Sequence, residues 1–87
     1  MHIILVYDMG QKRLPKMLKL CRQYLHWIQN SVFEGEISLA QLKELEYSIQ
    51  QLIDPEEDSV IIFQHRHKLH LEKKILGLEK SPLENLL

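Results

Sequence analysis

The sequence predicts an α+β fold with an antiparallel sheet, in one chain of 87 residues. Three observations support this: short apolar runs typical of buried strands, two longer stretches with apolar residues at helical spacing, and the order in which they follow one another. The predicted order is strand, helix, strand, strand, helix, strand. That order is the split β-α-β pattern of ferredoxin-like folds, which we expect over residues 1–66, followed by a C-terminal strand and tail over residues 67–87.

The first strand is predicted over residues 1–9, an apolar run that ends on one acid, Asp8. Side chains alternate along a strand, so Ile3 and Leu5 face one side of the sheet and Val6 faces the other. Both faces are therefore apolar before the acid. Because the two helices of such a fold cover only one face of the sheet, the second apolar face predicts a homodimer about a two-fold axis.

The first helix is predicted over residues 12–24, with Pro15 in its first turn, where no backbone donor is needed. Its apolar residues recur at helical spacing, and its cations fall mainly outside that stripe with no acid among them. These cations are Lys12, Arg13, Lys16, Lys19 and Arg22. Such a surface could bind the phosphates of a nucleic acid or could be a solvated helix face, and the charge pattern alone leaves both interpretations open.

The second and third strands are predicted over residues 24–29 and 31–37, antiparallel to each other. Gly35 inside the third strand indicates a bulge or a close approach of another backbone. Tyr24 and Trp27, beside the second strand, could stack on bases but are more typical of core or interface residues.

The second helix is predicted from residue 39 to about residue 53, because Ser38 and Gln41 form a capping box and Pro55 excludes the helical region just before it. A fourth strand is predicted over residues 59–64, again apolar on both faces.

The C-terminal part begins with residues 71–78, which we expect to form a fifth strand or an arm. Residues 81–84 have the pattern of a second capping box. We expect the leucines of the tail to pack on the chain's own dimer or to dock on another protein.

Composition limits the class of protein. The single cysteine, Cys21, excludes an internal disulfide and is typical of a reducing compartment. No apolar run approaches the about 20 residues that a membrane span needs, and no signal-peptide pattern is present. We therefore expect a cytoplasmic protein without a membrane partner.

Asp8, at the exit of the first strand, is the main candidate for chemistry. A lone carboxylate is a poor site for Mg²⁺, which prefers one or two carboxylates together with waters and phosphate oxygens. A two-fold axis near the strand exit would supply a second Asp8. The alternative is a turn acid whose side chain accepts the backbone N–H near Gly10.

Other familiar chemistries find little support. His65, His67 and His70 do not all share one strand face and have no cysteine nearby, which argues against a structural zinc site. The chain has no nucleophile triad, phosphate-binding loop or Cys-x-x-Cys motif. A regulatory small-molecule module would need a glycine-lined loop, for which only Gly10 and Gly35 are candidates.

Four motifs suggest a known family. They are LVYD at residues 5–8, SVFEGE at 31–36, IDPEEDSV at 53–60 and ILG at 75–77. With these motifs in this order and spacing, the chain resembles the small CRISPR-associated proteins of the Cas2 family.

The resemblance implies a ferredoxin-like homodimer that bridges two dimers of the Cas1 integrase. It also implies that the last strand crosses to the partner, so that residues 67–87 are exchanged with the partner or packed against it. That assembly captures short foreign DNA and inserts it into the CRISPR array, and some members are endonucleases on RNA or double-stranded DNA that depend on Mg²⁺ or Mn²⁺. The family's metal-binding acid corresponds to Asp8, contributed by both subunits, and its motif phenylalanine corresponds to Phe33, between Ser31 and Gly35.

One departure affects the expected function. In the family the loop after this aspartate often carries further acids and arginines, whereas here it reads MGQKR, with Arg13 and Lys12 as its cations. This favours a DNA-binding scaffold in CRISPR adaptation over independent cleavage. The alternative is a stand-alone metal-dependent endoribonuclease of the same fold.

Overall fold

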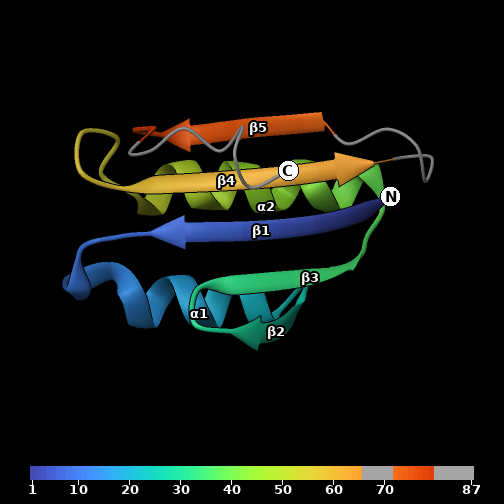
Figure 1. Cartoon of the computed structure of the whole chain (residues 1–87), viewed down its shortest axis with the longest axis horizontal. Coiled ribbons are helices and arrows are strands. Elements are labelled where there is room, and N and C mark those ends of the chain that lie inside the picture. The colour runs from blue at the N-terminus through green and yellow to red at the C-terminus, as the bar shows by residue number, and fades with distance from the viewer. Residues whose placement is uncertain (66–71, 80–87) are drawn as a thin grey trace.

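The computed structural model describes residues 1–65 and 72–79, with the side chains of residues 72 and 73 left out. The elements in chain order are β1 (His2–Asp8), the 3₁₀ turn η1 (Gln11–Arg13), α1 (Leu14–Arg22), β2 (His26–Gln29), β3 (Val32–Glu36), α2 (Leu39–Leu52), β4 (Ser59–His65) and β5 (Glu72–Gly77). The strands form one antiparallel sheet of five strands in the order β2-β3-β1-β4-β5 (Figure 1). The predicted α+β, ferredoxin-like arrangement is confirmed.

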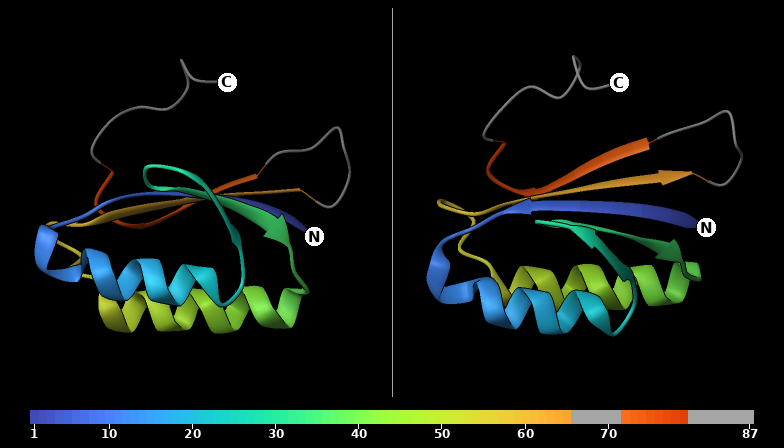
Figure 2. Two further views of the ribbon diagram at one scale, coloured as in Figure 1. Left: turned by 90° about the horizontal axis from the view of Figure 1, so that it is seen from below. Right: turned by 60° about the horizontal axis from the view of Figure 1, so that its bottom comes forward.

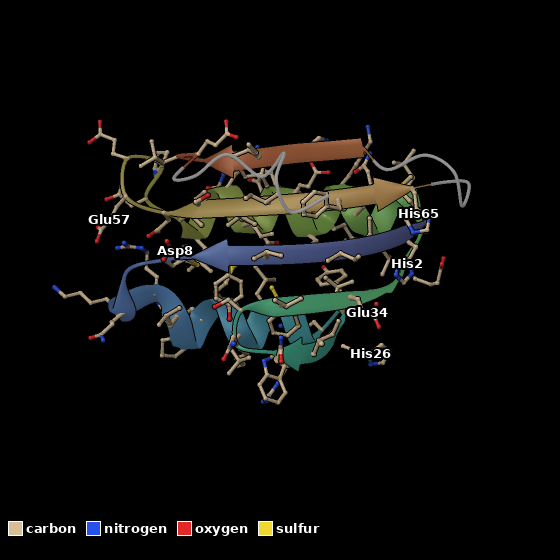
Figure 3. All side chains as sticks on the ribbon, in the orientation of Figure 1. His2, Asp8, His26, Glu34, Glu57 and His65 are labelled. Carbon is tan, nitrogen blue, oxygen red and sulfur yellow. The ribbon has the colours of Figure 1, made fainter. Side chains whose placement is uncertain are left out.

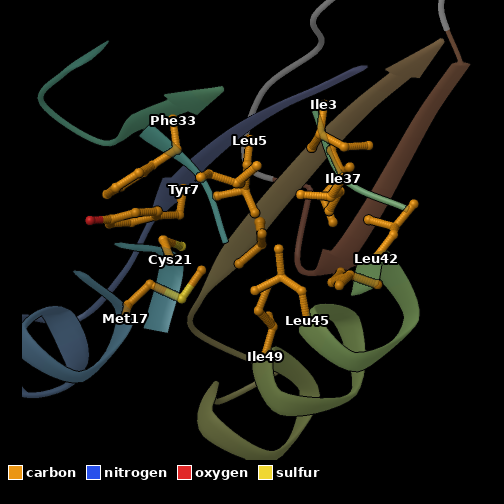
Figure 4. Packing of buried hydrophobic residues seen from close by; sticks show 14 of the residues in the cluster. Ile3, Leu5, Tyr7, Met17, Cys21, Phe33, Ile37, Leu42, Leu45 and Ile49 are labelled. Carbon is orange, nitrogen blue, oxygen red and sulfur yellow. The ribbon is translucent and has the colours of Figure 1, made fainter. Parts of the chain in front are cut away.

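Both helices pack on the same face of the sheet, as the two views of Figure 2 show. Ile3 and Leu5 of β1 point into this layer and are fully buried, as are Met17 of α1 and Leu45 and Ile49 of α2 (Figure 4). The apolar spacing of the two helices and the alternation of β1 therefore build one core between helices and sheet.

A second, smaller apolar cluster lies on the other face of the sheet. It consists of Ile61 and Phe63 of β4, each 8% exposed, with Ile4 and Ile75 packed against them. No helix of the described part of the chain covers this face (Figure 2). The two apolar faces predicted for β1 and β4 are thus present.

The strand β1 lies in the centre of the sheet with a neighbour on each side. It pairs with β3 from His2 opposite Glu36 to Val6 opposite Val32, and with β4 along its whole length. The last pair joins Asp8 to Ser59. The backbone at Asp8 is therefore held in the sheet up to the point where the strand ends.

The first helix and the second strand differ most from the prediction in their boundaries. The first helix begins with the separate turn η1, and α1 itself spans Leu14–Arg22 with Pro15 at its start. The second strand begins at His26 rather than residue 24, because the amides of Tyr24 and Leu25 donate to the Cys21 carbonyl at 3.1 and 2.8 Å and close the end of the helix.

The bulge in this part of the sheet lies in β2, between Trp27 and Gln29, and not at Gly35. Gly35 instead allows a close approach, since a Cβ there would lie 3.3 Å from Cδ2 and 3.5 Å from Cα of Leu25. Of the two predicted explanations for this glycine, the close approach is correct.

The predicted capping box is confirmed at the start of α2. The Gln41 amide donates to Ser38 Oγ at 3.1 Å, and the Ser38 amide donates to Gln41 Oε1 at 3.0 Å. The strand β5 pairs with β4 of the same chain, with Gly77 opposite Ser59. Exchange of this strand with a partner remains a prediction, and the predicted second capping box at 81–84 lies outside the described residues.

Candidate metal and nucleic-acid site

Asp8 is an exposed carboxylate at the end of the central strand (Figure 3). Its Cα is paired with Ser59 of β4, and the next residue, Met9, is buried in the main core. The strand and the buried methionine together hold the backbone on both sides of Asp8. The backbone at Asp8 thus lies on a rigid element, which is where a metal-binding or catalytic acid is best supported.

A second acid, Asp58, holds the loop that follows Asp8. Its side chain is fully buried and accepts from the Gly10 amide at 2.9 Å and the Asp54 amide at 2.8 Å. Arg13 donates to the same carboxylate through Nε at 2.5 Å and through a terminal nitrogen at 2.9 Å. The Gly10 amide therefore donates to Asp58, and not to Asp8 as the alternative for Asp8 had predicted.

The ion pair changes the acidity of both groups. The Arg13 hydrogen bond, opposed by burial and helped by the backbone amides of Asp54 and Gly10, lowers the pKa of Asp58 from 3.8 to about 2. The Asp58 hydrogen bond raises the pKa of the Arg13 guanidinium. Asp58 is thus ionised at neutral pH and acts as a structural acceptor rather than as a proton donor.

Arg13 is also paired with Glu57, at 3.0 Å, so both of its carboxylate partners come from the turn before β4. A hollow of about 420 Å³ lies beside this pair, lined by Gly10, Gln11, Lys12, Arg13 and Glu57. Glu57 lies at the same end of the sheet as Asp8 (Figure 3). The guanidinium of Arg13 is thus paired with carboxylates of its own chain. Its predicted contact with nucleic acid stays a prediction.

The other predicted cations form an exposed row. We call it the α1 cationic face, and it consists of Lys12, Lys16, Lys19 and Arg22. No carboxylate among residues 1–65 and 74–79 forms an ion pair with any of the four. Spacings of three and four residues place them along one side of η1 and α1. Their positive charge is therefore not neutralised within the described chain.

One chain supplies few ligands for a metal ion. Within the described ranges, no group of three or more histidine, cysteine or acidic side chains is placed to hold one. Asp8 alone satisfies the preference of Mg²⁺ only if waters, phosphate oxygens and a second carboxylate complete the coordination. The described residues of one chain thus do not by themselves complete a metal site.

Comparison with known proteins identifies the family. A family model described as CRISPR associated protein Cas2 matches residues 1–71. The chain belongs to the Cas2 family. A relative from Dictyoglomus turgidum named CRISPR-associated endoribonuclease Cas2 is 47% identical over 87 residues, and the match covers 100% of both chains. A relative of the same name from Thermococcus kodakarensis is 44% identical, again over 100% of both.

Solved Cas2 structures have the same fold. One, described as a crystal structure of Cas2, is 44% identical with a TM-score of 0.70, and covers 97% of this chain and 94% of its own. The structure of Streptococcus pyogenes Cas2 at pH 6.5 is 31% identical with a TM-score of 0.69, covering 75% of this chain and 86% of its own. A homodimer is consistent with these structures.

The residues of the SVFEGE motif make packing and backbone contacts within the fold. Phe33 is fully buried, and its ring stacks on Tyr7 with centroids 6.0 Å apart. The Ser31 carbonyl accepts the Tyr7 amide at 3.1 Å, and Gly35 packs against Leu25. These residues therefore hold β3 against β1 and position Asp8 one residue beyond Tyr7.

The opposite end of β1 carries a different polar cluster. His2 lies 3.4 Å from a carboxylate oxygen of Glu34 and 3.4 Å from one of Glu36, and its ring is 5.0 Å from that of His65 (Figure 3). The other two histidines considered for a metal site, His67 and His70, lie outside the described residues.

Two further findings limit the chemistry of the chain. Burial raises the pKa of the Cys21 thiol to about 12, so this cysteine is a core residue and not a nucleophile. No helix within residues 1–65 and 72–79 has the length and hydrophobicity to cross a bilayer.

Sequence reasoning missed Asp58, the residue that holds the Asp8 loop. The only signal was its place in the IDPEEDSV motif, where four acids follow one another closely and nothing distinguishes the buried one. It also missed the exposure of Trp27, which is 53% exposed and so not a core residue.

Proposed function

We propose that this chain is a dimeric nucleic-acid-binding scaffold of CRISPR adaptation that presents duplex DNA to the Cas1 integrase. The observation that supports this best is the α1 cationic face, whose four cations are exposed and lack carboxylate partners in the described chain. From Met9 to Phe33 the sequence contains no acidic residue at all. An uninterrupted positive surface of this kind binds phosphates without reading base sequence.

The dimer is part of the proposal. The cluster of Ile4, Ile61, Phe63 and Ile75 on the sheet face opposite the helices is the proposed contact between the copies. Two copies would double the number of phosphates contacted, to about eight if every cation of the α1 cationic face makes one contact. The logarithm of duplex affinity should then fall with the logarithm of salt concentration with a slope of about −7.

Fluorescence anisotropy of a labelled blunt duplex tests the scaffold. We expect the Lys16→Gln, Lys19→Gln, Arg22→Gln triple variant to bind at least about tenfold more weakly at low salt and to reduce the salt slope by about 5 in the dimer. Lys43→Gln, which removes an exposed cation from α2, is the control and should bind like wild type. Unchanged binding of the triple variant would refute the assignment of this surface.

A second candidate function is metal-dependent cleavage of RNA at Asp8. It is favoured by the exposed carboxylate on a rigid strand end and by the endoribonuclease name of the relatives. In this proposal the Asp8 side chains of two copies hold one Mg²⁺ or Mn²⁺, which when bound would supply an activated water and stabilise negative charge on the phosphate. The loop fixed by Asp58 and Arg13 keeps each Asp8 in place.

Cleavage of a labelled single-stranded RNA tests the second candidate. We expect Asp8→Asn and EDTA to abolish cleavage, while Glu57→Gln, which removes a neighbouring exposed acid, retains it. Cleavage by purified Asp8→Asn at the wild-type rate would exclude this mechanism and leave the scaffold proposal untouched.

A further inference from the structure

A pocket separate from the Asp8 loop lies between α1 and the turn that joins β2 to β3. Its volume is about 580 Å³, and Leu14, Pro15 and Leu18 form its α1 side. The turn side is formed by Trp27, with Asn30 and Ser31 next to it. This volume falls within the range of about 300 to 1,000 Å³ typical of small-ligand pockets.

Trp27 presents an aromatic ring that is held in place yet open to solvent. The indole Nε1 donates to the Asn30 carbonyl at 2.9 Å, and Asn30 adopts a positive φ of 45° that turns the chain back toward the ring. The ring nevertheless remains 53% exposed. Because its only hydrogen-bond donor is already paired and about half of its surface is exposed, the indole ring is available to stack on another ring.

The polar groups of the pocket suit an anion and not a cation. Arg22, in the last turn of α1, lines the pocket, and no acidic side chain does. Tyr7 also lines it. Arg22 belongs to the α1 cationic face as well, so the pocket opens onto the surface proposed to contact phosphates.

We propose that this pocket, the Trp27 pocket, binds one unpaired nucleotide of a nucleic acid, with its base stacked on Trp27 and its phosphate paired with Arg22. The proposal rests on the nucleic-acid-binding function proposed above and adds a preference for single-stranded segments. A base in a continuous duplex is stacked on its neighbours and cannot enter, whereas a base in a loop or at a frayed end can. An apolar side chain of a partner protein fits less well, because it would bury Arg22 beside it without a counter-charge.

Trp27 is the only tryptophan in the sequence, so intrinsic fluorescence of the full chain reports directly on the pocket. The probes are an oligothymidylate of about ten nucleotides, within the site sizes of single-strand binders, and a blunt duplex of the same length. We expect the single strand to quench the fluorescence to saturation. The duplex should bind, as anisotropy of a labelled copy shows, with little quenching.

Variants separate stacking from structure. Trp27→Ala should weaken binding of the labelled single strand about 5- to 150-fold, the range for loss of one base–aromatic stack, and leave duplex binding unchanged. Trp27→Phe keeps an aromatic ring but loses the bond to Asn30, and it should stay within a few-fold of wild type. Tyr47→Ala, which removes an aromatic residue that is 65% exposed on α2, is the matched control and should have no effect.

The outcomes distinguish this inference from the proposed function. Single-strand binding by Trp27→Ala equal to wild type, or equal quenching by duplex and single strand, would overturn the nucleotide pocket while duplex binding persists. If the wild-type chain bound neither probe at low salt, both the pocket and the nucleic-acid-binding function would be refuted.

Discussion

Two aspartates at the same end of the sheet have opposite surroundings. Asp8 ends β1 and is exposed, whereas Asp58 precedes β4 by one residue and is completely buried. The neighbouring residue pair, Asp8 and Ser59, joins the two strands there. Asp58 has Arg13 and two backbone amides around its carboxylate. The comparison indicates that Asp58 is a stabilising residue, whereas Asp8 stays the proposed ligand-binding acid.

The two acids are also linked. Asp58 binds Gly10 and Arg13, which lie two and five residues after Asp8, so it fixes the path of the chain as it leaves the strand. A variant of Asp58 should therefore reduce stability first and function only through the loop. A variant of Asp8 should do the reverse.

Asp58→Asn should lower the free energy of unfolding by about 3 kcal/mol, because it leaves Arg13 beside a partner that no longer carries a charge. Urea denaturation followed by circular dichroism measures the change. Glu57→Gln is the matched control, since Glu57 pairs with the same arginine at the surface, and it should cost less than about 1 kcal/mol. Equal effects of the two substitutions would contradict the structural importance of the buried acid.

Stability should fall in acid because of Asp58. Its pKa is lowered from 3.8 to about 2 in the folded chain, so its contribution is complete above about pH 4 and is lost as the pH falls toward 2. The shift corresponds to about 2.5 kcal/mol. Urea denaturation between pH 5 and pH 2 should show this loss in wild type and a smaller one in Asp58→Asn. Superimposable pH profiles would be inconsistent with the lowered pKa.

Gly77→Ala should destabilise the chain by about 2 kcal/mol, since its φ of 88° disfavours a side chain and an added Cβ would meet the Asp58 carbonyl oxygen. Thermal unfolding detects the change. Gly77→Asn tolerates a positive φ better but carries the same Cβ, so it should be nearly as destabilising if the clash dominates. A neutral Gly77→Asn would show that the backbone angle alone matters.

Asp8→Asn should change the free energy of unfolding by less than about 0.5 kcal/mol, because the side chain is exposed at the strand end. The same urea titrations provide the measurement. A loss as large as that of Asp58→Asn would show that Asp8 too is primarily a structural residue and would remove the contrast between the two acids.

The elements whose pattern is local were predictable. The alternation of β1, the stripes of α1 and α2 and the Ser38–Gln41 capping box all depend on residues within a few positions of one another. Asp58 was not predictable, since its burial depends on Arg13, 45 residues earlier. The bulge between Trp27 and Gln29 in β2 was not predicted either. Residue type therefore indicated Asp8 and the cations as candidates, but it did not reveal the contacts that hold the loop beside them.

Mn²⁺ binding measured by electron paramagnetic resonance tests most directly whether Asp8 is the ligand-binding acid. With a single-stranded RNA present, we expect one bound ion for every two wild-type chains. Asp8→Asn should lose that binding while Glu57→Gln keeps it. Retention of the ion by folded Asp8→Asn, at the same affinity and stoichiometry, would contradict the assignment.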